Sequence, residues 1–250
     1  MIRLLLFLLA LLSVRAAASQ DDPMGTATWP ARQAELFGDA PVVFDPRVRV
    51  MAPPVAEDPL QVPAAVDIDA SLAPRRVVVF ADYNPIVKVL AFEPHGTRPY
   101  LAFRLKMQQS GPLRAAVLDA TGVWRVGHTW ISTTGGGCTL PALARGDAEW
   151  ERRLNEVWAR RWRDGPHAGR VRFRILHPMD TGLAPGIPAF FLQSLTLTAP
   201  SNRPLMRLDV YEPVSENPVF TVDLPPGTSP ASLRLTGRDN NGNLVEADIP

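Results

Sequence analysis

Short stretches in which hydrophobic and polar residues alternate recur along the chain, separated by proline and glycine. The clearest is residues 170–175, where arginine alternates with valine, phenylalanine and isoleucine. A period of two turns one side of a strand toward a core and the other toward solvent. Repetition of such stretches at intervals of roughly ten to fifteen residues is typical of antiparallel β-sandwiches. The predicted strands are residues 48–50, 62–68, 75–80, 86–92, 100–107, 113–118, 123–132, 170–176, 190–198, 205–211, 219–224, 232–236 and 244–249.

Two segments have a helical pattern instead. Residues 29–37 carry a proline in the first turn and are followed by Gly38, which suits a C-terminal cap. Residues 147–163 place their apolar side chains at spacings that gather them on one helical face, with charged residues opposite. These apolar residues are Trp150, Leu154, Val157, Trp158 and Trp162. We therefore predict an all-β protein of two antiparallel sandwiches, residues 26–140 and 169–250, with a helical connector over 141–168.

The first eighteen residues predict a cleavable signal peptide. Arg3 supplies the positive start, residues 4–14 form an apolar run, and residues 16–18 are the small alanines that a signal peptidase requires. The apolar run is too short to cross a bilayer, which takes about 20 residues. We expect residues 1–18 to be removed and the mature protein to be periplasmic, with no membrane segment.

Net charge argues against two classes of partner. The formal charge is +1, and loss of Arg3 and Arg15 with the signal peptide makes it −1. A near-neutral chain gives no support for nucleic-acid binding or for attachment to anionic lipid. The 26 prolines disfavour long helices and suit many short strands.

Cys138 is the single cysteine, and it directly follows three glycines, Gly135, Gly136 and Gly137. Exported proteins usually pair their cysteines, and one thiol cannot close a disulfide within the chain. Three glycines weaken a core strand, and four extended residues reach about 13 Å. We therefore expect an exposed, reactive Cys138 on a flexible arm. The alternatives are a half-buried cysteine after a glycine turn and a disulfide between two chains.

Histidines near these features have simpler explanations than catalysis. His128 lies ten residues before Cys138 and would be able to lower the thiol pKa, act as a base or share a copper or zinc ion. An ordinary strand histidine is the simpler interpretation. His177 and Met179 would suit a metal, but a pair that caps a strand is the favoured interpretation. A structural zinc site usually needs four ligands, so one cysteine and four histidines make such a site improbable, and no metal or cofactor is predicted.

Particular motifs make the chain similar to a known pair of proteins. Residues 29–138 resemble the SoxY sulfur carrier, and the residues from 170 onward resemble its partner SoxZ. The SoxY-like motifs are Glu35-Leu36-Phe37-Gly38-Asp39, Ala52-Pro53, Ala56-Glu57-Asp58, Val62-Pro63, Asn84-Pro85 and Gly136-Gly137-Cys138. The SoxZ-like motifs are His177-Pro178-Met179-Asp180-Thr181-Gly182-Leu183, Ile187-Pro188-Ala189, Ser215-Glu216-Asn217-Pro218 and Asp239-Asn240 with Gly242. The chain resembles the fused SoxYZ-like carriers that are associated with quinoprotein dehydrogenases.

The resemblance implies a fold and a role. Both modules would be immunoglobulin-like sandwiches. Cys138 would carry a thiosulfonate or persulfide, and sulfur-metabolism or dehydrogenase proteins would act on this adduct. The chain would be a carrier rather than an enzyme, and either a monomer or a dimer linked through Cys138.

The segment after Cys138 departs from the family arm. SoxY ends in Gly-Gly-Cys-Gly-Gly, whereas here Thr139-Leu140-Pro141 follow and the chain continues. The arm is therefore a loop attached at both ends, which needs an open cleft on a partner. A redox or copper-handling accessory of a periplasmic dehydrogenase, using Cys138 with a histidine, is the alternative function.

Overall fold

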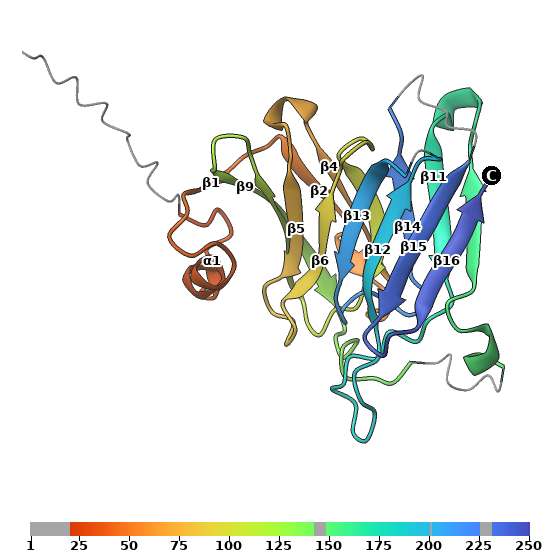
Figure 1. The fold of residues 1–250 in the computed structure, drawn as a ribbon. Helices are drawn as coiled ribbons and strands as arrows, with labels where there is room; N and C mark the ends of the chain where they lie inside the picture. Colours follow the sequence, from red (N-terminus) through yellow and green to blue (C-terminus); the bar gives the residue numbers. More distant parts are fainter. Residues whose placement is uncertain (1–20, 143–148, 201, 226–231) are drawn as a thin grey trace, which may run out of the picture.

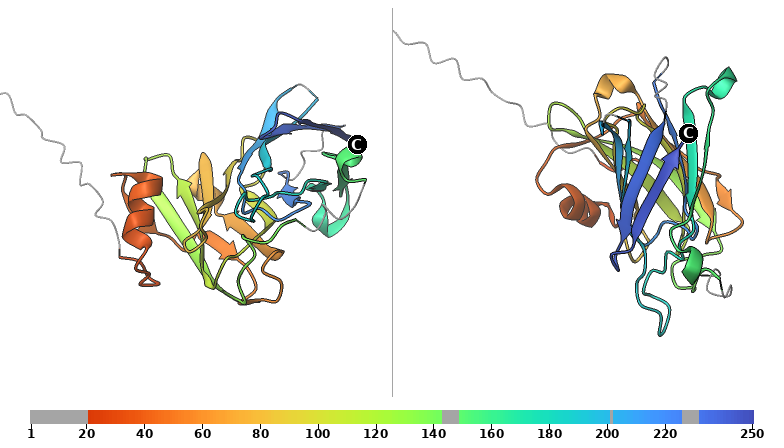
Figure 2. Two further views of the ribbon diagram at one scale, coloured as in Figure 1. Left: turned by 90° about the horizontal axis from the view of Figure 1, so that it is seen from below. Right: turned by 45° about the vertical axis from the view of Figure 1, so that its right-hand side comes forward.

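The computed structural model describes residues 21–142, 149–200, 202–225 and 232–250. The predicted signal peptide and residues 143–148 of the predicted connector lie outside these residues. The described strands form two facing sheets, seen edge-on in Figure 2. The all-β class and the sandwich layers are confirmed. Among the described residues, no helix has both the length and the apolar character that a membrane crossing requires.

The larger sheet follows the order β1-β9-β8-β5-β6-β13-β12-β15-β16, with β3 also paired to β9 (Figure 1). It begins and ends in different halves of the sequence. Its strands are β1 (Val42–Phe44), β3 (Val55–Ala56), β5 (Arg76–Ala81), β6 (Lys88–Glu93), β8 (Gly111–Leu118), β9 (Trp124–Thr133), β12 (Leu192–Thr198), β13 (Pro204–Val210), β15 (Leu233–Asp239) and β16 (Leu244–Ile249).

The smaller sheet follows the order β10-β11-β14-β7-β4-β2. It too combines strands from both halves of the sequence. Its strands are β2 (Val48–Met51), β4 (Val62–Ile68), β7 (Tyr100–Leu105), β10 (Val157–Arg161), β11 (Arg170–Ile175) and β14 (Val219–Asp223).

The two predicted sandwiches are joined edge to edge. Residues 90–93 of β6 pair with residues 207–210 of β13, and Leu101 and Ala102 of β7 pair with Val222 and Thr221 of β14. One hydrophobic core runs through both halves, from Val48 to Ile249. The modules are therefore halves of one continuous structure, because each completes the sheets of the other.

Helix α1 (Trp29–Phe37) forms where the sequence predicts it. A proline lies in its first turn, and Gly38 caps its end with a φ of 58°, in the left-handed region that glycine tolerates. Its ends are buried through Trp29 and Phe37, which pack beside the larger sheet with Val42 and Phe80. The helix lies at the outer end of the sheet in Figure 1.

The predicted connector helix is wrong where the structure describes it. Residues 151–153 form a single 3-10 turn, Asn155 has a φ of 65°, and β10 follows as an edge strand paired with β11. Trp158 is 39% exposed and stacks against the guanidinium groups of Arg153 and Arg174. The tryptophans therefore do not share a buried helical face, because strand pairing outweighs a local pattern that fits either element.

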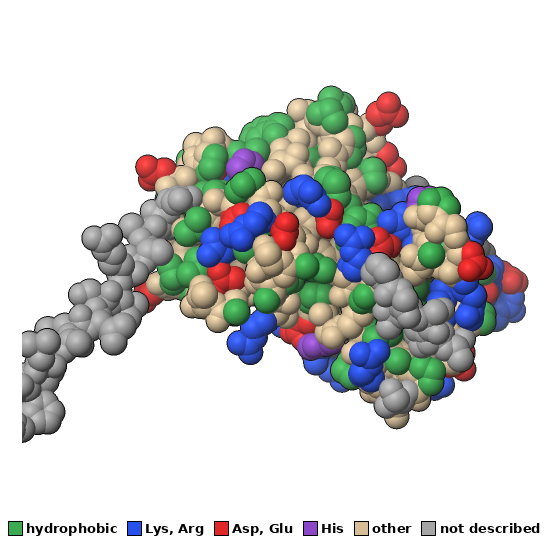
Figure 3. Space-filling view, turned by 90° about the horizontal axis from the view of Figure 1, so that it is seen from above, with side chains coloured by type: hydrophobic (Ala, Val, Ile, Leu, Met, Phe, Trp, Pro, Cys, Tyr) green, Lys and Arg blue, Asp and Glu red, His purple; other side chains and the backbone are tan. Residues whose placement is uncertain are grey.

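Charges on the surface are mostly balanced locally. Acidic and basic side chains are interspersed over the face shown in Figure 3. Arg76 illustrates the arrangement, since its guanidinium pairs with Glu93 at 2.6 Å and with Asp209 at 2.9 Å, across β5, β6 and β13. Exposed pairs of this kind contribute about 0–1 kcal/mol each.

Candidate functional site

The loop that carries Cys138 follows β9 and is fastened to the segment after β7. The Gly136 amide donates to the Gln108 carbonyl at 2.9 Å, and the Gly137 amide donates to the Met107 carbonyl at 3.0 Å. Met107 in turn donates its amide to the Pro59 carbonyl at 2.8 Å. The glycine segment is therefore paired backbone, and the predicted flexible arm is wrong for this conformation.

The glycines serve close packing here. Gly135 and Gly136 have φ values of 83° and 87°, which other residues rarely adopt. A Cβ at Gly137 would lie 2.2 Å from the Pro59 carbonyl oxygen and 2.9 Å from that of Met107. These distances are shorter than van der Waals contact, so only glycine lets the loop lie this deep. The same residues that predict an exposed thiol thus allow it to be buried.

Cys138 is buried, with 1% of its surface exposed, so the predicted exposed thiol is also wrong in this conformation. Its Sγ lies 3.7 Å from the Lys106 carbonyl oxygen, a contact in which a thiol is a weak donor. Its amide donates to Oε1 of Gln108 at 3.2 Å. Its carbonyl accepts a hydrogen bond from Oγ1 of Thr181 at 2.6 Å. Every polar group of the residue therefore has a partner.

Asn84 holds the backbone of the segment that contacts the thiol. Its Nδ2 donates to the Lys106 carbonyl at 2.8 Å, and its Oδ1 accepts from the Gln108 amide at 2.8 Å. The residue is 2% exposed, so these bonds are shielded from water. Asn84 thus fixes Lys106 and Gln108, which both bond Cys138.

The second half of the chain closes the site from the other side. Thr181 binds the Cys138 carbonyl, and Oδ1 of Asp180 accepts the Ala142 amide at 3.2 Å. Nζ of Lys106 donates to the Met179 carbonyl. The loop before β12 and the loop after β9 meet at the lower edge in Figure 1. The motif of residues 177–183 is therefore part of the thiol site, although it lies about forty positions away in the sequence.

His177 supports the backbone of this motif. Its Nδ1 accepts the Met179 amide at 3.0 Å, which fixes Met179 at a φ of 52°. Its ring lies against Phe190, and burial lowers its pKa, so the neutral form that accepts this bond is favoured. Within the described residues, no group of three or more His, Cys, Asp and Glu side chains is placed to hold a metal ion.

Burial controls the thiol chemistry. It raises the pKa of Cys138 from 9.0 to about 11, against the opposing charge of Lys106. Burial also lowers the pKa of Lys106 from 10.5 to about 8, against the negative charge of Cys138, Asp180, Glu216 and Glu212. The buried Cys138 thiol is therefore protonated at neutral pH and is a poor nucleophile.

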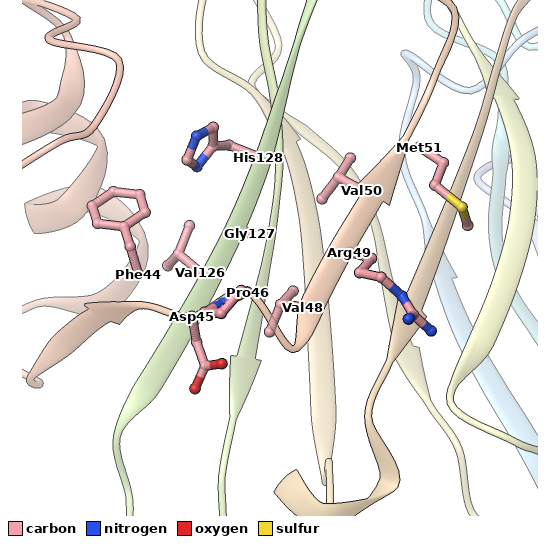
Figure 4. A pocket seen from close by; sticks show the side chains of 10 residues that line it. All are labelled: Phe44, Asp45, Pro46, Val48, Arg49, Val50, Met51, Val126, Gly127 and His128. Carbon is pink, nitrogen blue, oxygen red and sulfur yellow. The ribbon is translucent and has the colours of Figure 1, made fainter.

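His128 does not join this site. Its ring packs edge-on against Phe44 at 5.6 Å, and burial lowers its pKa. It lines a hollow of about 530 Å³ between β2 and β9, whose lining does not include Cys138 (Figure 4). A Cβ at Gly127 would meet the Val48 carbonyl oxygen at 1.8 Å, so glycine permits the close approach of these strands.

The sequence does not reveal that Lys106, Gln108 and Thr181 contact Cys138, although Thr181 belongs to the 177–183 motif. Each is an ordinary polar residue in a predicted strand or loop, and contact with the thiol depends on chain segments far apart. For Lys106 and Gln108 the signal is indirect, because it comes from Asn84 of the Asn84-Pro85 motif, which bonds both residues.

Two family models account for most of the chain. Residues 33–138 match the sulfur oxidation protein SoxY, and residues 163–250 match the sulphur oxidation protein SoxZ. These matches define the class: the all-β fold is that of sulfur oxidation proteins of the SoxY and SoxZ kind. The chain belongs to the SoxY and SoxZ families and carries both domains in one polypeptide. The first match ends at Cys138 itself.

Solved structures give weaker likenesses. The sulfur carrier protein SoxY from Chlorobium limicola f thiosulfatophilum is 21% identical over 43% of this chain and 96% of its own, with a TM-score of 0.38. The superoxide reductase (neelaredoxin) from Ignicoccus hospitalis is 21% identical over 34% of this chain and 79% of its own, with a TM-score of 0.29. Likeness at these scores does not bear on function. No curated protein matches the chain.

Proposed function

We propose that this protein is a periplasmic carrier that holds a sulfur-containing group covalently on Cys138 and presents it to partner enzymes. The observation that carries the proposal is the position of the only cysteine. It ends the SoxY match, and residues of the SoxZ match enclose it. The signal-like residues 1–18 support export, and the partners would be sulfur-metabolism or dehydrogenase proteins of the same compartment.

The loop must open for this role. Five hydrogen bonds connect residues 136–138 to residues 106–108 and 181. Gly136, Gly137 and Cys138 donate to residues 106–108, the thiol bond to Lys106 being a weak one, and Thr181 donates to the Cys138 carbonyl. A hydrogen bond contributes about 0.5–1.5 kcal/mol net, so opening the loop costs only a few kcal/mol. Local opening on this scale is common in folded proteins. The closed form would shelter the thiol, and the open form would exchange cargo.

Loading follows from thiol–disulfide chemistry. With tetrathionate as a donor, the Cys138 thiolate attacks an inner sulfur atom, forms Cys–S–S–SO₃⁻ and releases thiosulfate. No oxidant is needed, because the sulfur–sulfur bond of the donor is exchanged for another.

Intact-mass spectrometry tests the proposal. Protein purified without reductant is expected to carry added sulfur or sulfonate mass, and incubation with tetrathionate should bring all molecules to the thiosulfonate mass. Cys138→Ser should keep the fold and carry neither. An adduct that survives this substitution, or a wild-type protein that refuses the donor even after long incubation, would overturn the carrier function.

A further inference from the structure

Lys106 is an unusual residue to find inside a protein. It directly follows β7 and is 3% exposed, and a lysine is almost never fully buried unless an anion accompanies it. An exposed position would cost nothing, whereas this one removes a charged ammonium from water. The chain contains one other lysine, Lys88, and it is only partly buried.

The ammonium of Lys106 is incompletely paired. It has three hydrogen-bond donors, and the part of the chain that the structure describes offers them one acceptor, the Met179 carbonyl. The same part of the chain places no carboxylate within the 4.0 Å of an ion pair. Asp180, Glu216 and Glu212 act on it only through their charge. A buried cation in this state gains most from an additional anion.

Cys138 is the group next to it. The Lys106 carbonyl contacts Sγ of Cys138. Burial raises the pKa of this thiol, and the positive charge of Lys106 lowers it. A negative charge on the sulfur, or on a group attached to it, would supply the missing partner.

A small cavity lies beside Lys106, and Leu140, two residues after the thiol in the sequence, is one of its lining residues. It measures about 40 Å³ and lies between Lys106, the segment 140–142 that follows the thiol, and residues 58–61. A volume of this size exceeds what one water molecule needs. Asp58 and Glu216 also line it, so an anion there depends on Lys106 to balance their repulsion.

Resting on the proposed carrier function, we propose that Lys106 is the charge partner of the sulfur cargo, so that the closed loop shelters anionic adducts of Cys138 in preference to neutral ones. Lys106 acts as a specificity-determining residue, because it stabilises the closed state only when the attached group is negative. A neutral adduct leaves the ammonium without its anion and favours opening.

The test compares two adducts in two proteins. Tetrathionate gives the anionic Cys–S–S–SO₃⁻ form by the exchange described above. Methyl methanethiosulfonate gives the neutral methyl disulfide, because the thiolate attacks its sulfenyl sulfur and releases methanesulfinate. The rate at which dithiothreitol cleaves each adduct then reports how far the loop protects it. The ratio of the two rates cancels the intrinsic reactivity of the adducts when variants are compared.

In Lys106→Met, cleavage of the thiosulfonate relative to the methyl disulfide is expected to rise about tenfold or more, equivalent to one pKa unit of lost charge stabilisation. Lys106→Gln keeps a donor for the Met179 carbonyl and should behave in the same way, which separates charge from hydrogen bonding. Lys88→Met, the matched control, should leave the ratio unchanged. Replacement of a buried charge by an apolar residue of similar size commonly preserves folding.

An unchanged ratio in both Lys106 variants, or an equal acceleration of both adducts, would overturn the role of Lys106 and leave the carrier function intact. Failure of the wild-type protein to accept either group would instead overturn the carrier function, and this inference with it.

Discussion

At the scale of single residues, the site is a pair of groups that each favour the charged form of the other. Burial raises the pKa of Cys138 and lowers the pKa of Lys106, so both groups are difficult to ionise. The charge of each group shifts the pKa of the other in the opposite direction. Because burial dominates at the thiol, the closed state keeps it protonated. The thiol is therefore protected chemically as well as sterically while the loop is closed.

We expect the Cys138 thiol of the folded protein to titrate near pH 11 instead of 9.0. A shift of two pKa units lowers the thiolate fraction at neutral pH about a hundredfold. Since the folded pKa is raised, the stability that the closed loop gains from the protonated thiol is complete below pH 9.0 and is lost as the pH rises through 11. Alkylation by iodoacetamide, followed from neutral to strongly alkaline pH, measures the midpoint. A midpoint at or below that of the urea-unfolded protein would contradict this prediction.

At the scale of elements, Arg114 attaches the N-terminal segment to the larger sheet. Its side chain, on β8, is fully buried and pairs with Asp82 at 3.0 Å and with Asp22 at 2.8 Å. Its guanidinium also stacks on the Trp29 ring of α1 at 4.7 Å. Burial alone would raise the pKa of Asp22, but hydrogen bonds from Arg114 and Thr26 hold it well below its usual range. One side chain thus joins three separate elements.

Arg114→Met is expected to lower the free energy of unfolding by about 3–5 kcal/mol, because it leaves the Asp82 carboxylate buried without its ion-pair partner. Urea unfolding followed by tryptophan fluorescence measures the change. Arg172→Met, on the exposed side of β11, is the matched control and should change stability by less than about 0.5 kcal/mol. Addition of Asp82→Asn to Arg114→Met should restore part of the loss, and a single variant as stable as the control would refute this assignment.

At the scale of the whole molecule, each half of the chain depends on the other. The pairings β6–β13 and β7–β14 continue both sheets across the junction, and the hydrophobic core is shared. Separated halves would each expose two long unpaired strand edges, which promote association with other chains. The thiol site also depends on both halves, because Thr181 and Met179 of the second half bond Cys138 and Lys106 of the first.

Polypeptides covering residues 21–142 and 149–250 should therefore aggregate or self-associate when produced separately, and should form a one-to-one complex when refolded together. Size-exclusion chromatography with light scattering distinguishes these states. In the isolated first half, Cys138 should react with iodoacetamide as fast as in unfolded protein. A monomeric first half with a slowly reacting thiol would show that the second half is dispensable.

The sequence predicts the strands well and the environment of the thiol poorly, for a physical reason. A period of two is local, so β11 can be recognised from residues 170–175 alone. The segment 157–161 becomes strand β10 only because the edge of β11 is available to it. Likewise, three glycines allow either a mobile arm or a tightly packed loop. The carbonyl groups of Pro59 and Met107 that favour the second lie thirty or more residues away.

The Thr181–Cys138 hydrogen bond has one further consequence. Thr181 and Cys138 belong to one polypeptide. Their effective concentration relative to each other therefore does not depend on the concentration of the protein in the cell. A shelter built from two separate subunits would disappear on dilution, and a reactive sulfur group would then meet other thiols in the compartment. Here the enclosure of Cys138 is the same in a single molecule as in a concentrated solution.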